Sequence, residues 1–143
     1  MRALVLALGL LLTATPVVAG TVDLTVRFDG IEARGGSLRV GLFDSAQGFA
    51  QREDGVVATQ AVSADGETVV VHFDGLAPGH YAITAFHDAD DDGSLDKALG
   101  VLPREGVALS NDPALVPPPA FDAMAVDVTM DAEVTVRFRY LGG

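Results

Sequence analysis

Apolar and polar residues alternate with a period of two over most of the chain. In the first such segment, Val22, Leu24, Val26 and Phe28 are separated by polar or charged residues. A period of two places successive side chains on opposite faces of a β-strand, and each segment has the length of a strand. The pattern predicts six or seven strands, each with one apolar face. The later segments lie at residues 38–42, 69–73, 81–85, 124–128 and 134–140.

The segments between these strands have the composition of turns and loops. Residues 44–51 predict a short helix that Asp44 or Ser45 could cap. Residues 111–121 contain four of the seven prolines and predict an extended surface loop. Short strands separated by turns every roughly 8 to 15 residues are typical of an all-β domain. We therefore expect a single antiparallel β-sandwich with two sheets and about seven strands.

The first 19 residues differ from the rest in having no alternation. A positive charge at Arg2 precedes an apolar run over residues 3–12, and Val17 and Ala19 occupy the positions that a signal peptidase reads. This layout predicts a signal peptide at residues 1–19 and one domain at residues 20–143, in a periplasmic or secreted protein. The alternative is a retained membrane anchor, although the run is shorter than the roughly 20 residues that a spanning helix needs.

Charge and cysteine content narrow the choice of partners. Nine basic residues stand against 20 acidic ones, which gives a net charge of −11. Such a surface repels nucleic acid and anionic lipid and attracts cations, so we expect neither nucleic-acid binding nor membrane insertion after cleavage. The chain has no cysteine, which excludes thiol catalysis, cysteine-ligated zinc and disulfides.

An aspartate-rich loop follows the predicted strand that begins at residue 81. Its spacing is D-x-D-x-D-G-x-x-D, and the glycine at the sixth position, Gly93, would permit a sharp turn. Calcium takes six to eight oxygen ligands, and carboxylates at loop positions 1, 3 and 5 can surround one side of the ion. The seventh position would contribute a backbone carbonyl and the ninth a carboxylate. The predicted metal ligands are Asp88, Asp90, Asp92, Ser94 and Asp96.

The loop departs from an EF-hand at its twelfth position. Leu99 stands where an EF-hand has a bidentate glutamate, and no helical period flanks the loop. Further oxygens must come from elsewhere, and Glu105, Asn111 and Asp112 are candidates that the predicted ligand set does not include. Magnesium is an alternative ion. The alternative to any ion is a solvated acidic turn, because aspartate and glycine are common in loops.

The sequence gives little support for a histidine metal site or for a catalytic site. His87 lies on the same strand face as the apolar residues before it, so a packed or capped histidine is favoured over a metal ligand. His72 should face solvent. The sequence contains no G-x-S-x-G, no H-E-x-x-H and no glycine-rich phosphate loop. No residue therefore points to a particular enzyme reaction, and whether the protein is an enzyme stays open.

Two motifs stand at the centre of the chain, G-L-x-P-G-x-Y-A-I at residues 75–83 and H-D-x-D-x-x-G-x-L-D at residues 87–96. With these motifs, most of the chain after residue 19 resembles the bacterial DUF2141 family of uncharacterised exported proteins. The resemblance implies an immunoglobulin-like or prealbumin-like β-sandwich with an exported address, and it implies no reaction. Further shared positions are Gly100, Pro103, Glu105, Gly106, Ser110, Asn111, Pro119, Phe121 and Met124.

Two hypotheses of different classes follow. The first is an exported module of the bacterial cell envelope that binds a divalent cation, with calcium favoured, and has a binding or structural role. The second is a metal-assisted enzyme or a small-molecule carrier with its site beside the Asp88–Asp96 loop. A pocket of aromatic and polar groups next to the loop would favour the second hypothesis. An envelope protein or a small molecule could be a further partner in either case.

Overall fold

The computed structural model describes residues 9, 11–15, 20–94, 97–98, 102–103 and 105–141. Most of the predicted signal peptide and the predicted ligand Asp96 lie outside the described residues. Within the described part of the chain, no helix is both long enough and apolar enough to cross a membrane.

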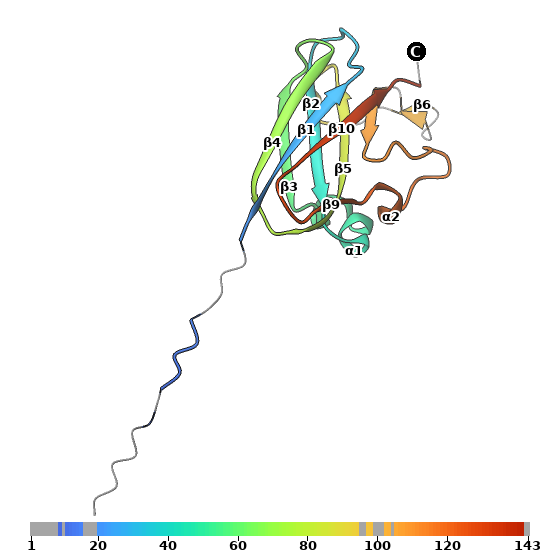
Figure 1. The fold of residues 1–143 in the computed structure, drawn as a ribbon. Coiled ribbons are helices and arrows are strands. Elements are labelled where there is room, and N and C mark those ends of the chain that lie inside the picture. The colour runs from blue at the N-terminus through green and yellow to red at the C-terminus, as the bar shows by residue number, and fades with distance from the viewer. Residues whose placement is uncertain are drawn as a thin grey trace, which may run out of the picture.

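Ten strands and three short helical segments make up the described fold (Figure 1). The two helices and the 3₁₀ segment are α1 (Ala46–Ala50), η1 (Arg52–Gly55) and α2 (Phe121–Met124). The strands β6 (Lys97–Ala98) and β7 (Leu102–Pro103) pair only with each other. The other strands are β1 (Val22–Asp29), β2 (Ser37–Phe43), β3 (Ala58–Ser63), β4 (Thr68–Leu76), β5 (Gly79–Asp88), β8 (Val107–Leu109), β9 (Val126–Val128) and β10 (Ala132–Arg139).

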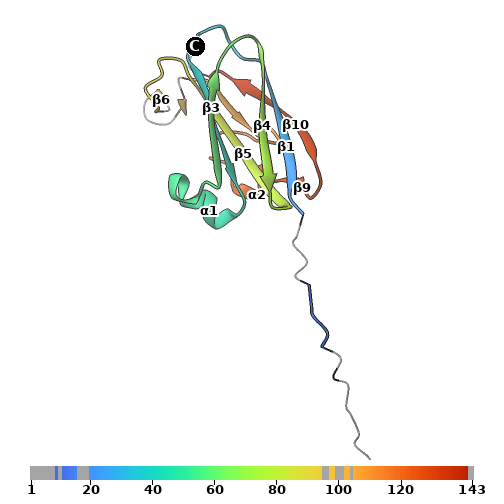
Figure 2. The same cartoon turned by 90° about the vertical axis from the view of Figure 1, so that its left-hand side faces the viewer.

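These eight strands form one strongly curved sheet. The hydrogen-bonded order is β3-β2-β5-β8-β10-β1-β4, and β9 pairs with β5 beside this path. The curvature brings the first and last strands of the order together, where the Gln60 side chain on β3 donates a hydrogen bond to the His72 carbonyl on β4. Figures 1 and 2 show the resulting shape, which is nearly a closed barrel. The order ends at β3 on one side and at β4 on the other, so these two strand edges lie beside each other where the barrel would close.

The prediction of an all-β domain with about seven strands is confirmed, but the expectation that all strands pair antiparallel is wrong for β1 and β10. These two strands pair in parallel over six residue pairs, from Leu24 with Ala132 to Asp29 with Arg137. Parallel neighbours need a long connection. Here nearly the whole domain connects them, since β1 and β10 are the first and last strands.

The core consists of the inward-facing residues that the alternation predicted. On β1, Leu24, Val26 and Phe28 are fully buried, and their polar neighbours face outward. The Phe28 and Phe138 rings lie 5.6 Å apart between centroids, which joins β1 to β10 across the core. Burying a large apolar side chain contributes about 1.5–3 kcal/mol. Burial of the inward-facing apolar side chains is therefore the main source of this domain's stability.

A second, smaller apolar cluster lies where α1 and α2 cover one end of the sheet. Phe43, Ala82, Phe121 and Met124 form its buried centre. The predicted helix is confirmed, with Ser45 as the cap, because its hydroxyl accepts the Gly48 N–H at 3.0 Å. The predicted extended loop at residues 111–121 is also confirmed up to Ala120.

One strand begins later than predicted, and two strands were not predicted. Met124 belongs to α2, and the strand expected at residues 124–128 begins at Val126. The strands β3 and β8 were not predicted. On β3 the partly buried residues include Gln60, whose polarity hides the alternation, and on β8 both Val107 and Ala108 are buried. A period-two pattern is visible only where one face is apolar and the other polar.

The turn before β2 provides a test of how closely the connection from β1 to β2 packs against the end of β5. Gly35 and Gly36 both have positive φ, at 70° and 72°. A methyl group on Gly36 would collide with the Asp88 carbonyl and the Ala89 backbone, whereas one on Gly35 would meet no atom within 4 Å. We expect Gly35→Ala to lower the free energy of unfolding by about 1–2 kcal/mol, the cost of a non-glycine residue in the left-handed region.

Gly36→Ala should cost roughly 1–3 kcal/mol more than Gly35→Ala, since the collision with backbone adds to the same conformational strain. Urea denaturation of the two variants measures the difference. Equal stabilities would show that the turn does not pack against the end of β5 as described.

Candidate metal centre

The aspartate loop begins where β5 ends, next to the start of β2. The register pairs Asp88 with Ser37 and Phe86 with Arg39. Along β5 the side chains alternate, so His87 faces the core and Asp88 faces outward. The side chain of Arg39 lies diagonal to Asp88 on this outer face, and its Nε is 3.1 Å from Asp88 Oδ2. β5 thus delivers the first predicted ligand to a fixed position.

The loop folds back over Asp88 through hydrogen bonds to its carboxylate. Asp88 Oδ1 accepts the Asp92 N–H at 3.1 Å, and Oδ2 accepts the Gly93 N–H at 2.8 Å. The loop can turn this sharply because Gly93 has φ +80°, which confirms the predicted turn, and Asp91 has φ +56°. As a result, the Asp88 side chain is fully buried although it ends a strand at the edge of the core.

Glu105 brings a third carboxylate to the same place from another part of the chain. It lies two residues before β8, and its Oε1 accepts the Ala89 N–H at 3.2 Å. One carboxylate oxygen from each of Asp88, Asp90 and Glu105 lies within 4.8 Å of the other two. Among the described residues, this is the one group of three such side chains close enough together to hold a metal ion. Asp88 and Glu105 are buried and Asp90 is exposed.

Opposing effects set the charge on Asp88. Burial raises its pKa, but hydrogen bonds with the Gly93 N–H, the Asp90 side chain and the Asp92 N–H, and then the Arg39 charge, together hold the pKa below its ordinary value. Asp88 is therefore ionised at neutral pH. A hydrogen bond between two carboxyl groups requires a proton on one of them, and a cation between them can take the place of that proton.

Two other predicted ligands, Asp92 and Ser94, lie in the same loop and do not belong to this cluster. The Asp92 carboxylate is exposed, and its Oδ1 accepts the Ser94 N–H at 2.8 Å. Ser94 is exposed as well. The ligand roles of Asp92, Ser94 and Asp96 stay predictions.

Of the three sequence-distant residues considered as further metal ligands, one lies at the loop and two lie elsewhere. Asn111 donates through Nδ2 to the Ala125 carbonyl at 3.0 Å, and Asp112 pairs with Arg139 at 3.0 Å. Asn111 therefore holds the end of α2, and Asp112 holds the loop after β8 against β10. Glu105 alone reaches the loop, although the sequence ranked it no higher than the other two. The pairing of β5 with β8 would have identified it, because antiparallel neighbours place the residues before β8 beside the end of β5.

His87 has the structural role that its position on the strand predicts. Its side chain is fully buried, and its Nε2 donates to the Gly35 carbonyl at 2.6 Å. A carbonyl can only accept, so the neutral ring carries its proton on Nε2, and Nδ1 accepts from the Tyr140 hydroxyl at 2.8 Å. The same hydroxyl accepts the Glu32 N–H at 3.0 Å. His87 thereby joins the turn before β2 to Tyr140, the residue after β10. His72 is exposed, as expected.

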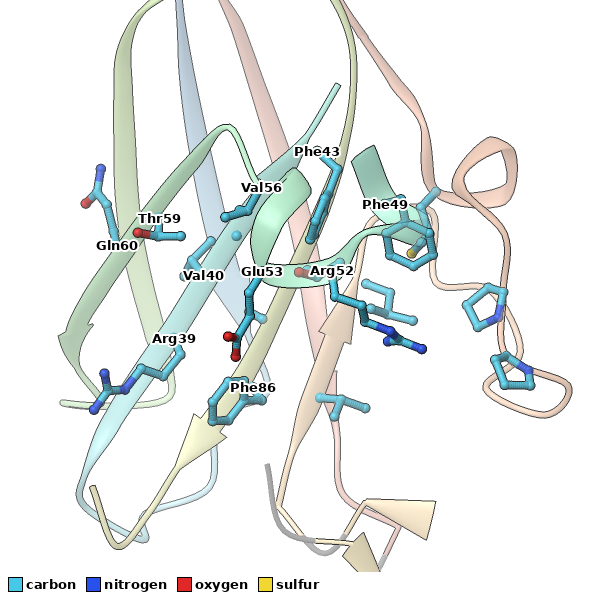
Figure 3. Close-up of a pocket in the computed structure, with 18 of the residues that line it drawn as sticks. Arg39, Val40, Phe43, Phe49, Arg52, Glu53, Val56, Thr59, Gln60 and Phe86 are labelled. Atoms are coloured by element: carbon cyan, nitrogen blue, oxygen red, sulfur yellow. The ribbon is translucent and has the colours of Figure 1, made fainter. Parts of the chain in front are cut away.

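A pocket of about 650 Å³ lies on the outer face of the sheet, beside the loop (Figure 3). It is lined by aromatic residues, among them Phe43, Phe49 and Phe86, and by polar and charged residues that include Arg39. Gly93 of the aspartate loop forms part of its wall. This is the kind of neighbouring pocket that the carrier or enzyme hypothesis requires.

The lowered pKa of Asp88 predicts how its contribution to stability depends on pH. The folded state favours the ionised form, so the contribution is complete above the ordinary pKa of 3.8 and is lost as the pH falls through the lower folded value. Without added metal, Asp88→Asn should lower the free energy of unfolding by about 1–3 kcal/mol near neutral pH, because several donors lose a charged acceptor. The gap between the two proteins should narrow toward about pH 3.

Urea denaturation of wild type and variant with a chelator present, at about pH 6 and about pH 3, measures this gap. Asp74→Asn is the matched control, since Asp74 is exposed on β4, and it should change stability by less than about 0.5 kcal/mol. A gap that stays constant between the two pH values would contradict the assignment of an ionised Asp88.

Comparisons with known proteins agree with the motifs described above. A family model described as "Uncharacterized protein conserved in bacteria (DUF2141)" matches residues 26–137, which include the second half of β1, the aspartate loop, Glu105 and most of β10. A search of the curated proteins found no match, and neither did a search of the solved structures. The chain therefore belongs to the bacterial DUF2141 family, as its sequence motifs predicted.

Proposed function

We propose that this protein is an exported module of the bacterial cell envelope that binds a calcium ion between the loop after β5 and the segment before β8. The observation that carries the proposal is the convergence of Asp88, Asp90 and Glu105, with oxygens within 4.8 Å of one another. Two of the three carboxylates are buried, and like charges gathered in a region of low polarity destabilise a fold unless a cation or a proton neutralises them.

Arg39 contacts the buried Asp88 of the cluster. Its guanidinium reaches Asp88 through Nε, on the oxygen that also accepts the Gly93 N–H. Asp88 Oδ1 accepts the Asp92 N–H, and the Asp88 carboxylate also shares a hydrogen bond with the Asp90 side chain. A divalent cation between Asp88 and Asp90 would replace the proton of that hydrogen bond, and its oxygen preference suits a cluster of three carboxylates.

Calcium fits this arrangement better than magnesium. Magnesium requires a nearly octahedral set of ligands and gives up its water reluctantly, whereas calcium accepts six to eight oxygens in irregular geometry. The ligands here come from a loop and from a segment before a strand, and no symmetry relates them. Further oxygens of the loop, from Asp92, Ser94 and Asp96, complete the proposed site. Because no bidentate glutamate occupies the twelfth position, we infer a weak site, with Kd of roughly 10⁻⁴–10⁻³ M.

The ion would have a structural effect before any other. Glu105 and Asp90 belong to segments 15 residues apart in sequence, and a shared ion would hold them together. The loop would then be ordered where the ion is abundant. A binding or structural role in the envelope follows from such a site.

The finer architecture belongs to the same proposal. We infer an immunoglobulin-like or prealbumin-like sandwich, in which β3, β2, β5 and β8 form one half and β10, β1 and β4 the other. The strand order and the common core of Leu24, Leu38, Ile83 and Phe138 support it. The exported address rests on the sequence pattern of residues 1–19.

Calcium should stabilise the folded domain. At a calcium concentration about ten times Kd, binding to the folded state alone adds about 1.4 kcal/mol, which raises the melting temperature by several degrees. The double variant Asp90→Asn with Glu105→Gln should lose this shift, because two of the three converging carboxylates become amides. Calorimetry with millimolar calcium and with a chelator measures both proteins.

Asp91→Asn is the matched control, because Asp91 lies next to Asp90 and is exposed but does not belong to the cluster. It should keep most of the shift. The proposal fails if wild type shows no shift or if the double variant shows the same shift. An equal shift with magnesium would overturn the choice of calcium.

Export predicts a shortened chain. If residues 1–19 are a signal peptide, protein recovered from the periplasm or the medium of an expressing bacterium should begin at Gly20. Intact-mass measurement of the recovered protein shows whether residues 1–19 have been removed. Ala19→Arg is the control that should block cleavage. Recovered protein that still carried residues 1–19 would instead support the retained anchor.

A further inference from the structure

The pocket beside the aspartate loop has the properties of a ligand site. Its floor is the outer face of β2, β3, β5 and β8, where a domain surrounded by water would ordinarily expose polar residues. Here Phe86, Val107 and Leu109 line it instead. The α1–η1 segment forms one wall and the proline-rich loop after β8 forms the other. A volume of about 650 Å³ lies within the range of roughly 300–1,000 Å³ that holds small organic ligands.

A glycine in the middle of β2 deepens the pocket. Gly41 lines it directly, and glycine inside a strand costs stability because it packs no side chain. An added methyl group would meet its nearest neighbours, Thr84 Oγ1 and Val56 Cγ2, at 3.4 Å, which is ordinary contact. Packing therefore does not require glycine at this position. A larger side chain would instead fill space above the sheet.

The walls carry positive charge although the protein is strongly acidic. Two of the chain's nine basic residues, Arg39 and Arg52, line the pocket with a single acidic residue, Glu53. Figure 3 shows Arg52 extending from the helical segment toward the opposite loop, while the Glu53 carboxylate points toward Phe86. Arg52 is exposed, and within the described part of the chain its side chain makes no ion pair or hydrogen bond.

The backbone holds Arg52 at a cost. Its φ of +58° is in the left-handed region, where glycine ordinarily follows a helix, and a non-glycine residue there costs about 1–2 kcal/mol. The backbones of Gly48 and Gly55 are in close contact, because a methyl group on Gly55 would collide with the Gly48 backbone. Strain of this kind gathers at functional sites. The strained residue here carries an exposed guanidinium beside an apolar pocket.

We propose that this pocket binds a small amphiphilic carboxylate, with its apolar body over Phe86 and Leu109 and its carboxylate on Arg52. A guanidinium recognises a carboxylate through two parallel hydrogen bonds. The half-buried apolar residues of the walls would lose their contact with water when the ligand binds. This proposal concerns a carrier function and does not depend on a bound cation.

Decanoate and decanol are suitable probes, because they share an apolar chain and differ in charge. With a chelator present, NMR titration of the wild-type protein should show decanoate shifting the amide signals of Gly41, Thr84 and Phe86, and leaving those of Thr25 and Thr135 unchanged. Decanol should bind to the same residues at least several-fold more weakly. Equal affinities, or shifts spread over the whole surface, would overturn the proposal.

Two variants locate the contacts. Arg52→Gln should lower decanoate affinity to about that of decanol and leave decanol binding unchanged, since only the charge contact is removed. Gly41→Leu should fill the pocket and abolish binding of both probes, with Thr135→Leu on β10 as the control that adds the same side chain on an exposed strand position away from the pocket. Unchanged decanoate binding in either pocket variant would exclude this site, and the wild-type titration remains decisive if Gly41→Leu does not fold.

Discussion

The burial of an ionised carboxylate at the end of β5 is the constraint on which this end of the domain depends. An unpaired buried charge is costly, so Asp88 has to be surrounded by donors. The loop supplies the N–H groups of Asp92 and Gly93, and β2 supplies Arg39. This one requirement accounts for the direction of the loop and for the conformation of Gly93. It also accounts for the position of β2, whose first residue, Ser37, pairs with Asp88.

The neighbouring residue His87 meets an equivalent requirement on the inner face. Because successive side chains of a strand point to opposite faces, β5 ends with one buried polar group on each side. Asp88 makes contacts with the loop and β2, and His87 makes hydrogen bonds with the Gly35 turn and with Tyr140, the residue after β10. Segments from four parts of the chain are thus tied to two consecutive residues. This explains why a central strand ends in a polar pair.

The sequence predicted what depends on local pattern and missed what depends on pairing. Alternation identified β1, β2, β4, β5 and β10, because each has one face in the core. It could not give the strand order or the parallel pairing of β1 with β10, which arise from contacts between distant segments.

The candidate site divides in the same way. The loop spacing identified Asp88 and Asp90 as neighbours, but Glu105 joins them only through the pairing of β5 with β8. Spacing alone also cannot tell whether a carboxylate accepts hydrogen bonds from the backbone or is free to bind an ion. The Asp92 side chain accepts the Ser94 N–H, a competition between backbone and ion that no pattern of residue types reveals.

Arg39 physically links the two proposed sites. Its Nε is 3.1 Å from Asp88 Oδ2, and its side chain also lines the pocket on the outer face of the sheet. A cation held by Asp88 would share the negative charge that otherwise acts on Arg39 alone, and would leave more of the guanidinium's charge for an anion in the pocket. Coupling between two binding equilibria is reciprocal, so an anion near Arg39 would favour the cation to the same degree. A strongly acidic protein can in this way hold an anionic ligand next to its most acidic loop.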